Sequence, residues 1–134
     1  MACLLDTNAW IQLLKSAACP VADHLRQVAA HEVFLCSVVK AELWHGAQKY
    51  GNRERRLAVL EQLFSGYISL HFDDEAARHY GDIRHELELQ GAVIGPHDLQ
   101  IAAICRARGL TLVTSDTEEF SRVSGLRVED WSRG

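Results

Sequence analysis

Short apolar segments alternate along this chain with longer segments in which apolar residues recur at helical spacing. The short segments predict β-strands at residues 2–5, 32–36, 67–72, 110–114 and, more briefly, 126–128. The periodic segments predict helices at about residues 8–15, 21–30 and 54–65. A further helix is capped by Ser37 and runs through Glu42, and another is capped by Asp73 and ends near Gly91. The last predicted helix begins at Pro96 and ends at Gly109. Strands and helices therefore alternate from one end to the other.

This alternation predicts an α/β fold, with a central, mostly parallel sheet of about five strands flanked by helices in three layers. We see no linker or repeat, so residues 1–134 are expected to form a single domain. In such sheets ligands bind beyond the carboxyl ends of the strands, where the strand order reverses. Asp6 and Asp116 follow the first and fourth predicted strands. If those strands are neighbours, the two acids share one crevice.

Four acidic residues stand in apolar or turn contexts that a solvated surface acid would not need: Asp6, Glu42, Asp98 and Asp116, called the four acids below. Brought together, they would raise one another's pKa unless a cation were bound. Sets of oxygen ligands suit Mg²⁺ or Mn²⁺, and such sites support metal-activated hydrolysis of phosphodiesters. Asp98 also suits the first turn of a helix and Asp116 an N-cap, and both roles are compatible with metal binding.

Composition is that of a globular protein, with 48% hydrophobic and 24% charged residues in 134. No apolar run approaches the roughly 20 residues of a membrane span, and the N-terminus lacks the features of a signal peptide. The four cysteines show neither a C-x-x-C pair nor zinc-like spacing, so we expect reduced thiols in a cytoplasmic protein.

The net charge of −4 is not that of a typical nucleic-acid-binding protein. Without the four acids, however, 14 acidic residues remain against 14 basic ones, and 11 of the basic residues are arginine. Arginine suits bidentate contact with phosphate. Arg53, Arg55 and Arg56 cluster in one polar stretch, which fits either phosphate contact or a solvated helix start.

Three other chemistries fit the sequence less well. Glu42-x-x-His45 is half of a carboxylate di-iron motif, but the second E-x-x-H segment is missing. A phosphate-receiver domain needs an acidic pair after the first strand and a lysine after the last, whereas Asp6 stands alone and no lysine follows Lys49. Glycoside hydrolysis by two carboxylates would leave two of the four acids without a role.

Each of the four acids lies in a longer stretch with a recognisable pattern: residues 4–8 (LLDTN), 37–43 (SVVKAEL), 94–103 (IGPHDLQIAA) and 112–116 (LVTSD), followed by 119–131. In this order and spacing the stretches resemble the PIN-domain ribonucleases, and more closely the VapC-type toxins of bacterial toxin–antitoxin pairs. The resemblance covers nearly the whole chain. Two positions depart from the pattern of relatives: His97 replaces a frequent Tyr or other bulky residue, and Asp116 a frequent Asn, which strengthens the metal site.

The resemblance implies a PIN-like fold and a Mg²⁺ site, with Mn²⁺ as an alternative ion, in which the four acids are both metal ligands and catalytic residues. It implies supporting polar roles for Asn8, Thr114 and Ser115. It further implies a toxin that cleaves RNA, such as tRNA, by metal-activated water, a small VapB-type antitoxin as partner, and a homodimer. An apolar stripe on the predicted long helix suits either core packing or a dimer face: Ala76, Ala77, Tyr80, Ile83 and Leu87. The alternative is a housekeeping or non-catalytic PIN-like domain that binds RNA or protein.

Overall fold

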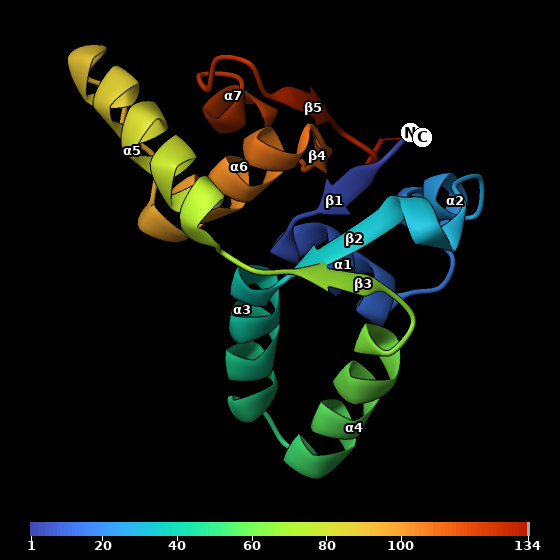
Figure 1. Cartoon of the computed structure of the whole chain (residues 1–134). Helices are drawn as coiled ribbons and strands as arrows, with labels where there is room; N and C mark the ends of the chain where they lie inside the picture. The colour runs from blue at the N-terminus through green and yellow to red at the C-terminus, as the bar shows by residue number, and fades with distance from the viewer. Residues whose placement is uncertain (134) are drawn as a thin grey trace.

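The computed structural model describes residues 1–133 and is built on a five-stranded, entirely parallel sheet (Figure 1). The strands are β1 (Cys3–Leu5), β2 (Val33–Cys36), β3 (Ile68–Leu70), β4 (Thr111–Val113) and β5 (Arg127–Glu129). Their order is β3-β2-β1-β4-β5, so β1 and β4 are neighbours and the strand order reverses between them. The predicted α/β class and parallel sheet are confirmed, and the pairing of β1 with β4 meets the condition under which Asp6 and Asp116 share one crevice.

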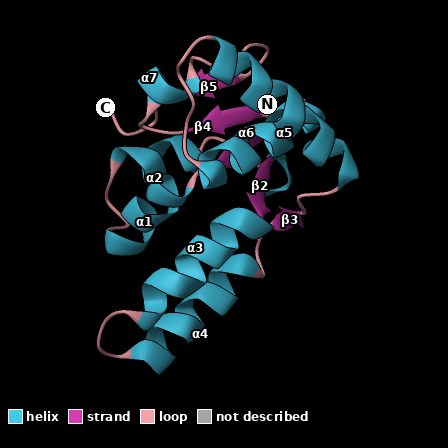
Figure 2. Cartoon of the chain, turned by 90° about the vertical axis from the view of Figure 1, so that its left-hand side faces the viewer, coloured by secondary structure: helices cyan, strands magenta, loops and turns pink. Residues whose placement is uncertain are grey.

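Seven α-helices and one 3₁₀ turn connect the strands within residues 1–133 (Figures 1 and 2). They are α1 (Thr7–Lys15), α2 (Pro20–Leu25), η1 (Ala30–Glu32), α3 (Ser37–Gln48), α4 (Arg53–Phe64), α5 (Asp74–Leu89), α6 (Pro96–Arg108) and α7 (Thr117–Phe120). The chain moves across the sheet in one direction from β1 to β3 and then returns to β4. Because parallel crossovers are right-handed, the helices of these two halves cover opposite faces of the sheet. The three-layer arrangement follows from this reversal.

The core lies between the sheet and both helix layers. Strands β1 and β4 are buried along their whole length, as expected for central strands of a sheet covered on both faces. Trp10 of α1 is fully buried, and its indole Nε1 donates a hydrogen bond to the Leu5 carbonyl at 3.1 Å. This contact ties the first helix to the end of β1, from which Asp6 emerges.

The structure corrects three local predictions. The second helix ends at Leu25 rather than near residue 30, because bonds from Gln27 N to the His24 carbonyl and from Val28 N to the Leu25 carbonyl tighten its last turn. Ser37 is the first residue of α3, and Cys36 takes the N-cap position that we had predicted for Ser37. Residues that follow Asp116, for which no helix range was predicted, form the short helix α7 with Asp116 at its N-cap position.

The predicted apolar stripe of α5 is used mainly inside the chain. Asp73 caps this helix as predicted, accepting a hydrogen bond from Ala76 N at 2.9 Å. Ala76, Ile83 and Leu87 are buried, and α5 packs along α6, whereas Ala77 is exposed. The stripe therefore serves core packing, and the homodimer stays a prediction.

All four cysteines are free thiols, and Cys3, Cys36 and Cys105 are buried. Burial raises the pKa of the Cys3 and Cys36 thiols to about 11, which keeps them protonated near neutral pH. Among residues 1–133, no helix combines the length and apolar character needed to cross a membrane.

Candidate metal centre

Asp6 is the most buried of the four acids, with 7% of its surface exposed. It follows β1 directly, and its backbone N–H donates to the Val113 carbonyl at 3.0 Å, which extends the pairing of β1 with β4 by one bond. Its carboxylate caps α1 by accepting a hydrogen bond from Ala9 N at 3.0 Å. The side chain is thus fixed at the point where the strand order reverses.

Thr114 links the two acids that follow the central strands. Its side chain is buried, and its Oγ1 accepts a hydrogen bond from the Asp116 backbone N–H at 3.0 Å. The same hydroxyl donates to the Asp6 carboxylate, which opposes the burial that raises the pKa of Asp6. One hydroxyl therefore positions both Asp6 and the loop that carries Asp116.

Glu42 and Asp98 come from helices on either side of the sheet edge. Glu42 lies on α3, and Asp98 is in the first turn of α6, which packs against α3. The Thr7 hydroxyl donates to Glu42 Oε1 at 2.8 Å, so α1 holds this carboxylate in place. Thr7 was not among the predicted supporting residues, although it stands beside Asp6 in the sequence.

Glu119 joins the site and was missed by sequence reasoning. Carboxylate oxygens of Asp98, Asp116 and Glu119 all lie within 4.8 Å of one another. The i, i+3 spacing of Asp116 and Glu119 was visible, but only the folding of α7 turns both side chains toward Asp98. Asp116 takes the N-cap position of α7, yet its carboxylate meets that of Glu119 rather than a backbone N–H.

The acids of the site raise one another's pKa. A hydrogen bond to Asp116, followed by burial and the charges of Asp116 and Asp98, raises the pKa of Glu119 to about 7. Burial is the largest cause of the raised pKa of Asp98, and the charge of Glu42 adds to it. Burial also dominates for Asp6, with smaller contributions from Asp98 and Glu42. These mutual effects place the four acids and Glu119 in one electrostatic cluster.

The cluster fits a hard divalent cation. Its donors are all carboxylate oxygens, the ligand type preferred by Mg²⁺ and Mn²⁺. The ligand atoms of Asp98, Asp116 and Glu119 are close enough to share one ion, and a bound cation would relieve the repulsion that raises their pKa. Asp6 and Glu42 lie outside this group of three but within electrostatic reach of Asp98.

The remaining predicted residues lie at the rim of the site. Asn8 is exposed in the first turn of α1, and Ser115 is exposed next to Asp116. His97 places its Nδ1 3.8 Å from Glu42 Oε2, with 65% of its side chain exposed. His45 is also exposed, on the helix that carries Glu42. Roles for Asn8 and Ser115 stay predictions.

A doubly wound parallel sheet with carboxylates at its switch point defines an α/β protein with a cluster of acids that could hold a cation. A family model described as "PIN domain" matches residues 3–126. A tRNA(fMet)-specific endonuclease VapC of Shigella flexneri is 43% identical over 129 residues, covering 96% of this chain and 97% of the relative. Ribonuclease VapC2 of Haemophilus influenzae is 38% identical over 128 residues, covering 96% of each chain.

Solved structures give the same result. A chain in the crystal structure of DNA-bound VapBC from Salmonella typhimurium superposes with a TM-score of 0.91 at 37% identity, covering 98% of both chains. For VapBC2 from Rickettsia felis, bound to a DNA fragment from its promoter, the TM-score is 0.90 at 31% identity, with 98% and 99% coverage. The chain belongs to the PIN domain family and, within it, to the VapC ribonucleases.

The first prediction concerns the Thr114 hydroxyl. Thr114→Val keeps the shape of the side chain but leaves the buried Asp6 carboxylate and the Asp116 N–H without their shared partner. We expect a loss of about 1–3 kcal/mol in the free energy of unfolding, measured by denaturant titration, and weaker Mg²⁺ binding by calorimetry. Thr114→Ser retains the hydroxyl and should recover most of both. Losses that are equal for Val and Ser, or larger for Ser, would contradict the role assigned to the hydroxyl.

The second prediction is a pH dependence of the metal-free protein. The pKa of Glu119 in the folded protein, about 7, exceeds its ordinary value, so the folded state holds a proton that the unfolded chain releases. This contribution to stability is complete below about pH 4.5 and is lost as the pH rises through about 7. The melting temperature of wild type should therefore fall more between pH 5 and pH 8 than that of Glu119→Gln. Glu118→Gln, which changes the exposed neighbour, should follow wild type; a parallel course for all three proteins would contradict the prediction.

Proposed function

We propose that this chain is a Mg²⁺-dependent endoribonuclease that acts as the toxin of a VapBC-type pair and cleaves tRNA. The observation that carries the proposal is the carboxylate cluster at the junction of β1 and β4, which joins residues distant in sequence at one edge of the sheet. The relative from Shigella flexneri, named for cleavage of tRNA(fMet), supports tRNA as the substrate class because its identity of 43% extends over 96% of this chain. The functional unit is the whole chain as one domain.

The four acids, together with Glu119, would hold the ion. A bound divalent cation lowers the pKa of a coordinated water and offsets the negative charge that develops on the phosphate. Asp6 and Glu42 are the fixed carboxylates, because Ala9 N and the hydroxyls of Thr114 and Thr7 hold them. Asp116 is exposed, so the open side of the cluster faces solvent, from which an RNA phosphate can approach.

Glu119 adds a group that exchanges a proton near neutral pH. In the metal-free cluster its carboxyl holds a proton against Asp116. Binding of a cation would release that proton and allow all the carboxylates to ionise together. No Ser, Cys or His nucleophile is needed for hydrolysis by water, and the exposed His97 lies where it can contact RNA beside Glu42.

A partner follows from the neighbouring structures, which are toxin–antitoxin complexes. We propose that a VapB-type antitoxin binds this chain and directs an Arg or Lys side chain at the acids, where a charge-assisted contact would compete with the cation. The proposal includes a cytoplasmic location, because the chain would meet tRNA and the antitoxin there. It also includes a homodimer.

The activity is tested on a tRNA pool. Wild type with Mg²⁺ should produce discrete new RNA ends, mapped by sequencing, and EDTA should abolish them. Asp6→Asn removes a fixed carboxylate while retaining an oxygen that can accept the Ala9 N hydrogen bond, so cleavage should fall by at least about a hundredfold in a folded protein. Glu118→Gln is the matched control and should cleave like wild type. Cleavage by Asp6→Asn at the wild-type rate, with contaminating nuclease excluded, would rule out the assigned site.

The toxin role is tested in cells. Expression of the chain alone should arrest growth, because uncontrolled RNA cleavage stops translation, while Asp6→Asn should be harmless. Co-expression of the adjacent open reading frame should restore growth and yield a co-purifying complex. Harmless expression of a soluble protein that cleaves RNA in vitro would instead favour a housekeeping nuclease.

A further inference from the structure

Basic side chains leave the acidic cluster almost untouched. Among the ion pairs of residues 1–133, only the contact of His97 with Glu42 joins a basic side chain to the four acids or to Glu119. The carboxylates are therefore free to hold a cation. A phosphate next to the one at the cation must find its positive partner outside the cluster, because the carboxylates repel it.

Arg122 stands one turn beyond Glu119. Its backbone N–H donates to the Glu119 carbonyl at 3.3 Å, an i to i+3 bond that continues the end of α7 as a 3₁₀ turn. Side chains three residues apart eclipse in such a turn. The side chains of Glu119 and Arg122 therefore leave the backbone on the same side, and Arg122 stands beside the cluster.

The side chains of Glu119 and Arg122 reach the same loop, which joins α5 to α6. The Gly95 N–H donates to the Glu119 carboxylate, and a terminal nitrogen of the Arg122 guanidinium donates to the Ala92 carbonyl at 3.5 Å. Ala92 and Gly95 are three residues apart, so at most about 11 Å separates them. The guanidinium thus lies at the rim of the site, close enough to meet a phosphate that neighbours the one at the cation.

Most of the hydrogen-bonding capacity of Arg122 is unused. A guanidinium carries five N–H donors, and residues 1–133 offer this side chain one acceptor, the Ala92 carbonyl. Within the same residues no carboxylate forms an ion pair with Arg122, which is exposed. The remaining donors suit a phosphate group, which arginine can bind through two parallel hydrogen bonds.

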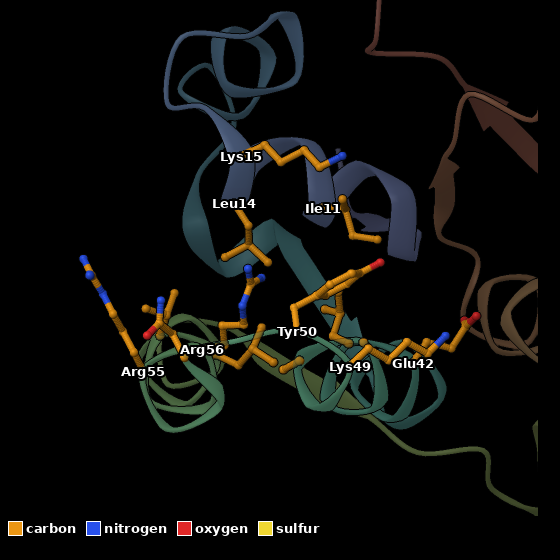
Figure 3. A pocket seen from close by; sticks show the side chains of 14 residues that line it. Ile11, Leu14, Lys15, Glu42, Lys49, Tyr50, Arg55 and Arg56 are labelled. Carbon is orange, nitrogen blue, oxygen red and sulfur yellow. The ribbon is translucent and has the colours of Figure 1, made fainter.

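His97 marks the opposite rim of the site. Its Nδ1 lies 3.8 Å from Glu42 Oε2, and 65% of its side chain is exposed. Glu42 is also one end of a groove of about 590 Å³ between α1 and the hairpin formed by α3 and α4 (Figure 3). Between Arg122 and His97 the rim is formed by residues 90–96, which carry no charged side chain. A polyanion laid along this rim meets a basic residue at each end and an uncharged loop between them.

We propose that an RNA strand crosses the site along this rim, from Arg122 to His97, with the cleaved phosphate at the cation. The inference rests on the ribonuclease function proposed above. Arg122 binds the phosphate next to the cleaved one, and the imidazole of His97 donates a hydrogen bond to the sugar–phosphate backbone beside Glu42. Both residues bind substrate and set its affinity, while the acids and the cation carry out hydrolysis.

The charge of Arg122 separates this role from a structural one. A structural role would be to fasten α7 to the loop before α6, and the bond to the Ala92 carbonyl could do so. That bond is long and exposed, so it contributes little to stability, and any N–H donor could form it. Phosphate binding, in contrast, needs the positive charge. The two roles therefore predict different results for substitutions that keep the donor or keep the charge.

Steady-state kinetics on the mapped tRNA substrate test the role of Arg122. Arg122→Gln keeps an N–H donor for the Ala92 carbonyl but loses the charge, so KM should rise by about tenfold while kcat stays within about twofold. The slope of log KM against log salt concentration should fall by about 0.7–0.9, as expected for one lost phosphate contact. Arg122→Lys keeps the charge and should restore the slope and most of the KM.

Arg127→Gln is the matched control for Arg122. Arg127 also donates to a backbone carbonyl, that of Gly109 at 3.0 Å, but it begins β5, at the edge of the sheet away from the acids. This variant should keep the wild-type KM and salt slope. Calorimetry should show unchanged Mg²⁺ binding for Arg122→Gln. If Gln instead preserves KM and only Arg122→Ala loses activity and Mg²⁺ affinity, Arg122 is a structural tie and the inference is overturned.

His97 is tested in the same assay. His97→Gln keeps an N–H donor and should stay within about twofold of the wild-type KM, whereas His97→Phe keeps the ring without a donor and should raise KM by about fivefold. His85→Phe, on the exposed face of α5, is the control. A wild-type KM for His97→Phe would show that the strand does not follow this rim.

Three further outcomes separate the inference from the function on which it rests. If wild type cleaves RNA but the Arg122 and His97 variants keep its KM and salt slope, the path is wrong while the ribonuclease function stands. If these variants cleave normally yet no longer bind a co-expressed antitoxin, the rim binds protein and the inference is overturned. If wild type cleaves no RNA, the proposed function fails and the inference falls with it.

Discussion

The site depends on the parallel pairing of β1 with β4. Cys3, Leu4 and Leu5 pair with Thr111, Leu112 and Val113, and the Asp6 N–H extends the ladder to the Val113 carbonyl. This register places Asp6 beside Thr114, whose hydroxyl connects it to Asp116. A slip of one residue would turn every side chain of the strand to the other face of the sheet and separate the two acids. The buried apolar strands thus fix the position of the carboxylates.

The carboxylate cluster is held together against its own repulsion. Burial and neighbouring charges raise the pKa of Asp6, Asp98 and Glu119, so the metal-free fold tolerates the cluster by keeping a proton on it. Hydrogen bonds from backbone and hydroxyl donors hold the more enclosed acids in place. Repulsion among these carboxylates destabilises the metal-free fold. A cation that bound them would relieve the repulsion, which favours binding.

Opposite charges are segregated within this small protein. The acidic cluster lies at the switch point of the sheet, and the excess of basic residues lies on the α3–α4 hairpin, with Glu42 where the two regions meet. A uniformly acidic surface would repel RNA, whereas a local basic surface can draw a polyanion toward acids that a cation has neutralised. Net charge alone, at −4, gave no sign of this arrangement.

Local signals in the sequence were enough to predict the α/β class, the five strands and nearly all the long helices, and they singled out the four acids as candidates, because apolar periodicity and isolated acids in apolar contexts can be read along the chain. Tertiary structure decided what depends on contacts between distant segments. Glu119 joins the cluster only because α7 forms and turns toward Asp98, and Thr7 supports Glu42 only because α1 packs on α3. The stripe of α5 suited a core or an interface equally, until its packing on α6 assigned it to the core. The groove, too, exists only where α1 meets the α3–α4 hairpin, since sequence periodicity specifies which face of a helix is apolar but not which neighbour covers it.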